Sequence, residues 1–126
     1  MARNQQATQT AHLLTVAKGL CPVLFVGMVP VNEAKMPFLD CFYFNHADQY
    51  RYKEMIKQAC GQAEIPYLDL FDFWQSRGLD WIHSHLMEDG LHPNVAGYKA
   101  LLDDVLNWPD LHQALQTADY SLERLN

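Results

Sequence analysis

Residues 21–30, CPVLFVGMVP, decide the class of fold. The run from Val23 to Val26 is continuously apolar and lies between Pro22 and Pro30. A short run that is apolar on both faces is typical of a parallel strand covered by helices on both sides. The sequence therefore predicts a strand over residues 23–26 in an α/β protein.

Helical patterns lie on either side of this strand. Residues 4–18 are expected to form a helix that Gly19 ends. Its apolar positions are Leu13, Val16, Ala17 and Leu20. Residues 31–44 lack a clear period and predict a loop. A second helix is expected from the N-cap Asn45, with Asp48 in its first turn, to Gly61.

The second half of the chain repeats this alternation. IPYLDLF, residues 65–71, predicts a second short strand. A helix is expected over the stripe Val95, Tyr98, Leu102 and Val105, stopping near Trp108 and Pro109. Residues 109–126 predict a C-terminal helix capped by Asp110. Its stripe of Leu111, Leu115, Ala118, Leu122 and Leu125 is expected to fold back on the domain, as terminal helices commonly do.

This order of elements predicts one α/β domain over residues 1–126. Helix and strand alternate, which implies right-handed crossovers and a parallel sheet. Two strands cannot bury the apolar faces of three helices, and two-stranded sheets are marginal by themselves. The sequence therefore predicts part of an α/β sheet, with open strand edges that invite pairing with another chain.

The block DGLHPNVAGY, residues 89–98, holds the candidate catalytic residues. His92 is suited to general base catalysis near neutral pH, and Asp89 can reach its ring from the same loop because Gly90 permits a tight turn. Pro93 stiffens the exit, and Asn94 can cap the following helix. The alternative is that Asp89 and His92 only cap a helix and hydrogen-bond locally.

The block, the PYLDLF strand before it and the earlier VGMVPV segment together resemble the C-terminal half of the SGNH, or GDSL-type, serine hydrolases. The resemblance covers roughly residues 10–107. It implies a flavodoxin-like three-layer α/β/α sandwich with a parallel sheet of about five strands. It also implies that His92 is the general base of a serine-hydrolase triad and that Asp89 orients it.

The chain departs from the family in its first half. The family has its nucleophile in a Gly-Asp-Ser block and oxyanion donors in a glycine block and a Gly-x-Asn-Asp block, and this sequence has none of these. Its serines, Ser76, Ser84 and Ser121, follow no glycine-aspartate pair. The resemblance therefore implies a truncated esterase or lipase-like hydrolase that keeps the last two strands and acts on a small ester only if complemented.

A metal site is the main alternative for the histidines. His83 and His85 would place two imidazoles on one side of a strand, with His92 and Glu88 or Asp89 nearby. The family likeness explains His92 without a metal, and no residues that would orient such metal ligands can be identified from the sequence. We therefore expect neither a metal nor a cofactor. Ser84 has no glycine or elbow beside it that would favour a nucleophile.

Composition limits the partners. The net charge is −6 and the nine basic residues are scattered, which argues against binding nucleic acid or anionic lipid. No apolar run approaches the roughly 20 residues of a membrane span, and the N-terminus lacks the apolar core of a signal peptide. The three cysteines, Cys21, Cys41 and Cys60, have no paired spacing and suggest reduced thiols in a cytoplasmic protein.

Two functions remain open. One is a fragment of an acyl-ester hydrolase that retains Asp89 and His92. The other is a non-catalytic α/β interaction module that forms a homo-oligomer or pairs with a partner N-terminal half.

Overall fold

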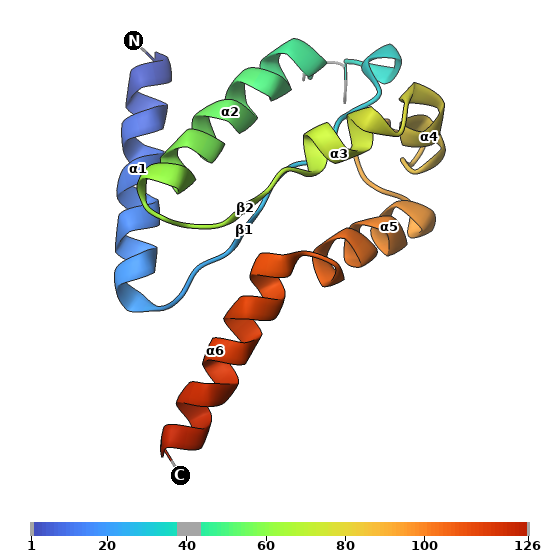
Figure 1. The fold of residues 1–126 in the computed structure, drawn as a ribbon. Helices are drawn as coiled ribbons and strands as arrows, with labels where there is room; N and C mark the ends of the chain where they lie inside the picture. Colours follow the sequence, from blue (N-terminus) through green and yellow to red (C-terminus); the bar gives the residue numbers. More distant parts are fainter. Residues whose placement is uncertain (1, 38–43, 126) are drawn as a thin grey trace.

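The computed structural model describes residues 2–37 and 44–125 as a helix-rich α/β fold (Figure 1). In chain order the elements are α1 (Ala2–Leu20), β1 (Phe25–Val26), the 3-10 helix η1 (Glu33–Lys35), α2 (His46–Gln62), β2 (Tyr67–Leu68), α3 (Leu70–Ser76), α4 (Leu79–Ser84), α5 (Val95–Leu106) and α6 (Pro109–Leu125). Residues 38–43 of the predicted loop and Cys41 with them lie outside the described residues.

A small parallel sheet of two strands lies between the helices. Phe25 pairs with Tyr67 and Val26 with Leu68, so the predicted parallel pairing is confirmed. The ladder includes the bond from the Gly27 N–H to the Leu68 carbonyl at 2.9 Å. Within the described ranges, no strand pairs with the other edge of β1.

Helices cover both faces of this sheet. Val23 and Phe25 pack against a cluster built from α1, α2 and Ile65, whereas Leu24 packs against a second cluster that includes Trp108. Successive residues of a strand point to opposite faces, which explains this division. Figure 1 shows α1 and α2 on one side of the strands and α5 and α6 on the other. The apolar run of residues 23–26 indicated this arrangement correctly, although Val26 stays partly exposed.

The predicted strand over residues 65–71 is wrong at its carboxyl end. Leu70 begins α3 because Asp69 caps that helix, its Oδ1 accepting the Asp72 N–H at 3.1 Å. Leu70 and Phe71 are buried on α3. A short apolar run does not distinguish a strand from a buried helical turn, which is why the pattern failed here.

The predicted N-caps Asn45 and Asn94 are confirmed, but the predicted glycine stops are wrong. The side chains of Asn45 and Asn94 accept the N–H groups of Asp48 and Gly97 and so begin α2 and α5. Gly19 and Gly61 lie inside α1 and α2, each of which ends one residue later.

The apolar stripes of α1 and α5 are helical, but much of each points away from the core. On α1 the buried residue is Leu14, while Leu13, Val16 and Leu20 are exposed. On α5 the core contacts come from Leu101 and Val105. The other stripe residues of α5 are exposed, namely Val95, Tyr98 and Leu102. Periodicity identified the helices but not which face is buried.

Helix α6 does not fold back along its length. Leu111 packs on the Trp108 cluster, but Leu115 is 55% exposed, and Figure 1 shows the helix projecting away from the body. The predicted packing of the stripe is therefore wrong at Leu115 and Ala118, which are exposed, and the side chains of Leu122 and Leu125 lie outside the described residues. The helix begins at Pro109, so Asp110 lies in its first turn rather than at the cap.

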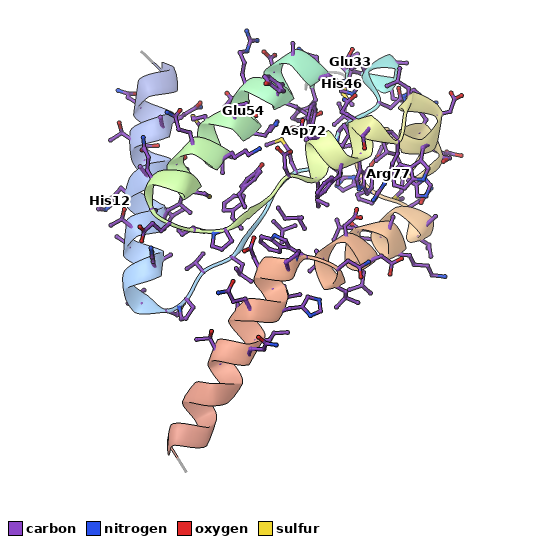
Figure 2. The ribbon with its side chains drawn as sticks, in the orientation of Figure 1. His12, Glu33, His46, Glu54, Asp72 and Arg77 are labelled. Atoms are coloured by element: carbon purple, nitrogen blue, oxygen red, sulfur yellow. The ribbon has the colours of Figure 1, made fainter. Side chains whose placement is uncertain are left out.

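A buried ammonium group joins α2 to α3. The Lys53 side chain is fully buried, and its Nζ lies 2.9 Å from both Asp69 and Asp72 and 2.6 Å from Glu54. Figure 2 shows Glu54 on α2 and Asp72 on α3. Burial by itself lowers the pKa of Lys53, but the hydrogen bonds to the three carboxylates outweigh it and raise that pKa above its usual value.

None of the helices in the described ranges combines the length and the hydropathy needed to cross a bilayer. Among the cysteines, the thiol of Cys60 is buried and that of Cys21 is exposed, and neither forms a disulfide.

Candidate active site

The block DGLHPN forms the turn and the return arm of a short antiparallel hairpin. Leu86 and Pro93 pair across it. The Met87 N–H donates to the His92 carbonyl at 2.7 Å, and the Asn94 N–H donates to the His85 carbonyl at 3.0 Å.

The turn of this hairpin requires a glycine. Gly90 has a φ of 71°, in the left-handed region that other residues rarely adopt. A Cβ at Gly90 would also lie 2.6 Å from the Cβ of Lys35. The hairpin therefore keeps its tight turn and its close contact with η1 only with glycine at this position.

Asp89 and His92 are in direct contact, as the sequence predicted. Asp89 Oδ2 lies 2.6 Å from His92 Nδ1, and Oδ1 accepts the backbone N–H groups of Leu91 at 2.8 Å and His92 at 3.0 Å. An ionised carboxylate only accepts hydrogen bonds, so Nδ1 must carry a proton and Nε2 is the basic nitrogen of the neutral ring. Asp89 therefore also accepts local backbone hydrogen bonds, as expected from the alternative that the two residues only cap and hydrogen-bond locally.

Asp89 is held in its charged form. The hydrogen bond from His92 lowers the pKa of the Asp89 carboxyl to about 2, and the Leu91 N–H acts in the same direction. The His92 side chain is 54% exposed and that of Asp89 is 26% exposed. The pair is thus an accessible base with a fixed anion beside it.

The hairpin lies against the segment that follows the carboxyl end of β1. The Asn32 N–H donates to the Gly90 carbonyl at 2.8 Å. The hairpin is thus held near the carboxyl ends of the strands, where open α/β sheets place their sites.

Helix α2 holds this segment in turn. The Gln49 side chain accepts the Val31 N–H and donates to the Val29 carbonyl, both at 3.0 Å. His46 Nε2 lies 2.6 Å from the Val31 carbonyl, and Figure 2 shows His46 beside Glu33 of η1. Sequence reasoning missed Gln49 and His46 because their partners are 15 to 20 residues away.

The described serine side chains, those of Ser76 and Ser84, hydrogen-bond to backbone carbonyls of their own helices. Ser84 Oγ donates to the Trp81 carbonyl at 2.7 Å, and Ser76 Oγ donates to the Phe73 carbonyl at 2.6 Å. The side chain of Ser121 lies outside the described residues. Ser76 and Ser84 therefore turn back on their own helices.

The histidine pair His83 and His85 is not on a strand, so the strand geometry assumed for the alternative metal site is wrong. His83 lies in α4 and His85 caps its end, with the His85 ring stacked on Trp81 at 3.7 Å. Within the described part of the chain, the one trio of metal-ligand side chains with converging atoms is Glu54, Asp69 and Asp72. The Lys53 ammonium already lies among these carboxylates.

An open groove of about 610 Å³ reaches the hairpin at Leu91, the residue before His92. Its lining is mostly apolar, with Met28, Val29 and Val31 from the segment after β1 and Tyr52 from α2. A groove with this lining can receive an uncharged group next to Leu91, the sequence neighbour of His92.

Comparison with known proteins identifies the family. No curated protein matches the chain closely. The model of the GDSL-like lipase/acylhydrolase family matches residues 2–100, which include both strands and the hairpin with Asp89 and His92. The chain therefore belongs to the GDSL-like lipase/acylhydrolase family.

Proposed function

We propose that this chain supplies the general base of an acyl-ester hydrolase, with His92 as the base and Asp89 as the residue that orients it. The observation that carries the proposal is the 2.6 Å contact between His92 Nδ1 and Asp89 Oδ2, with the second carboxylate oxygen fixed by two backbone N–H groups. Membership of a family of lipases and acylhydrolases supports this reaction class.

In this mechanism the nucleophile is a serine outside these 126 residues. His92 Nε2 takes the proton of the serine hydroxyl as its oxygen bonds to the ester carbonyl carbon. The bond from that carbon to the alcohol oxygen then breaks, and Nε2 returns the proton to the leaving alcohol. Water attacks the acyl-serine in the same way and releases the acid. Asp89 stays ionised and stabilises the imidazolium at each step.

We propose that the completed protein has the three-layer α/β/α sandwich, with further strands added beyond β1. The open edge of β1 and the helices on both faces of the sheet support this arrangement. Strands added at that edge would end near the hairpin because the carboxyl ends of parallel strands meet at one edge of a sheet.

Reconstitution tests the catalytic proposal. The chain is co-expressed with the N-terminal segment of a GDSL-like hydrolase that ends before its own Asp-x-x-His block, and the complex is isolated by size-exclusion chromatography. We expect hydrolysis of p-nitrophenyl acetate by the complex, with a loss of at least about 100-fold in His92→Ala, since general base catalysis contributes 10²–10⁴-fold. An active complex that His92→Ala leaves unchanged would contradict the proposal.

The exposed apolar surfaces favour a second role, association with another chain. The open β1 edge and the exposed residues Val95, Tyr98 and Leu102 on α5 are surfaces of the kind that pair with partners. We propose that the purified chain forms a homodimer or larger species.

Sedimentation equilibrium at micromolar concentrations measures this association. We expect a mass above the 14.5 kDa of one chain. Leu102→Lys should shift the distribution toward the monomer, whereas Lys99→Ala, a change at an exposed polar residue of the same helix, should not. A cooperatively melting monomer at every concentration would exclude the association.

A further inference from the structure

The side chain of Asn94 makes three hydrogen bonds that join the hairpin to α5. Its Oδ1 accepts the Gly97 N–H at 2.9 Å, which caps α5. Its Nδ2 donates to the Ser84 carbonyl at 2.9 Å and to the Leu86 carbonyl at 3.1 Å. Every one of these partners is a backbone group, so the amide fixes the path of the chain at three points.

These bonds connect the two arms of the hairpin. Leu86 lies on the arm that leads into the turn, Ser84 ends α4 just before this arm, and Asn94 ends the arm that returns from the turn. His92 is two residues before Asn94, and its carbonyl accepts the Met87 N–H of the opposite arm. A shift between the arms would therefore move the His92 ring relative to Asp89.

The first turn of α5 also contacts the chain at His85, just before the hairpin. A Cβ at Gly97 would lie 2.1 Å from the His85 carbonyl oxygen. The backbone of α5 thus contacts the arm that Asn94 holds, and this close approach leaves little freedom for the hairpin to tilt.

We propose that Asn94 is a positioning residue that sets the register of the hairpin and thereby the contact between Asp89 and His92. The proposal rests on the proposed function for its catalytic meaning, but its structural content can be tested alone. Only an amide combines an acceptor for the helix cap with two donors for the carbonyls. Serine or aspartate would cap α5 equally well, so capping by itself does not require asparagine.

The experiment removes the two hydrogen bonds that Asn94 Nδ2 donates but keeps a side-chain oxygen that can cap α5. Asn94→Ser retains a capping oxygen, and the matched control Asn45→Ser makes the same change at the N-cap of α2, away from the hairpin. The readout is the pKa of the Asp89 carboxyl, followed by carbon-detected NMR on the intact chain. A merely structural loss of helix stability would not move this pKa.

We expect the pKa of Asp89 to rise from about 2 toward the ordinary value of about 3.9 in Asn94→Ser and to stay at about 2 in Asn45→Ser. If Asn94→Ser does not fold, Asn94→Asp replaces it, because aspartate also caps α5. Its readout is amide exchange at Met87, which should be at least about 10-fold faster than in the wild type relative to amides inside α5.

An unchanged Asp89 pKa in folded Asn94→Ser, or unchanged Met87 exchange in Asn94→Asp, would overturn the proposal. The outcome is separable from that of the catalytic proposal. A raised Asp89 pKa together with a reconstituted complex indifferent to His92→Ala would leave the positioning role intact and remove the catalytic one.

Discussion

The molecule contains two charged clusters of opposite construction. Lys53 lies on α2, whereas Asp69 and Asp72 lie where β2 joins α3, 16 and 19 residues after Lys53. The Lys53 ammonium is fully buried. Asp89 and His92 are three residues apart on one hairpin, and the histidine is half exposed. The first cluster connects elements, and the second presents a base to solvent.

The difference follows from the cost of removing charge from water. A buried ammonium is tolerated only when carboxylates surround it. The Lys53 cluster therefore requires α2 to pack closely against the junction of β2 with α3. An exposed pair keeps its hydration and needs only a local turn. The chain therefore combines a buried ion cluster that joins α2 to α3 with an ion pair that stays accessible to solvent.

Removing the charge of Lys53 from its buried cluster of carboxylates should have the largest effect on the free energy of unfolding. Lys53→Met keeps the volume of the side chain but leaves Asp69, which is mostly buried, with only the half-exposed Lys57 as an ammonium partner. We expect the free energy of unfolding to fall by about 3 kcal/mol, as for removal of one partner of a buried ion pair. Urea unfolding followed by circular dichroism measures it.

The matched control is Lys57→Met, because Lys57 also contacts Asp69 at 3.0 Å but is half exposed. The loss there should be below about 1 kcal/mol. Equal losses in the two variants would show that burial does not distinguish the two lysines.

The exposed pair of Asp89 and His92 should make a smaller contribution to the free energy of unfolding, and this contribution should depend on pH. The folded pKa of Asp89, about 2, lies below the unfolded value of about 3.9, so its contribution is present above pH 4 and is lost as the pH falls toward 2. Because the pair is exposed to solvent, we expect about 1 kcal/mol rather than the full linkage value.

The measurement is the difference in unfolding free energy between the wild type and Asp89→Asn at pH 6, 4 and 2.5. Subtraction removes the carboxylates that the two proteins share, Asp69 among them. A difference that stays constant over this range would contradict the assigned role of Asp89.

The smallest effect is expected for His92→Ala in the isolated chain. The ring is exposed, so the free energy of unfolding should fall by less than about 1 kcal/mol. Hydrolysis of p-nitrophenyl acetate by the isolated chain should equal that of the variant, because the nucleophile and oxyanion donors supply most of the rate enhancement of a serine hydrolase. A burst with an acyl group trapped on a serine of this chain would refute this expectation.

Local signals predicted the site better than they predicted the packing. Asn45, Asn94 and the Asp89–His92 contact depend on partners within three residues, and each was predicted from the sequence. The buried faces of α1 and α5 depend on distant contacts, and most of the apolar stripe residues predicted for these helices are exposed. Leu14 was missed on α1 because it lies between two stripe residues that point outward.

The sequence by itself determined the two parallel strands, the N-caps Asn45 and Asn94, and the contact between Asp89 and His92. Apolar runs indicate the strands, and hydrogen bonds between residues three apart specify the caps and the contact. Tertiary structure alone decided that Lys53 is buried among Asp69, Asp72 and Glu54. It also decided that Gln49 holds the segment after β1 and that Asn32 of this segment bonds to the hairpin. These contacts join residues far apart in the chain. Their energy depends on desolvation and on the exact approach of packed elements, and neither quantity is encoded in residue spacing.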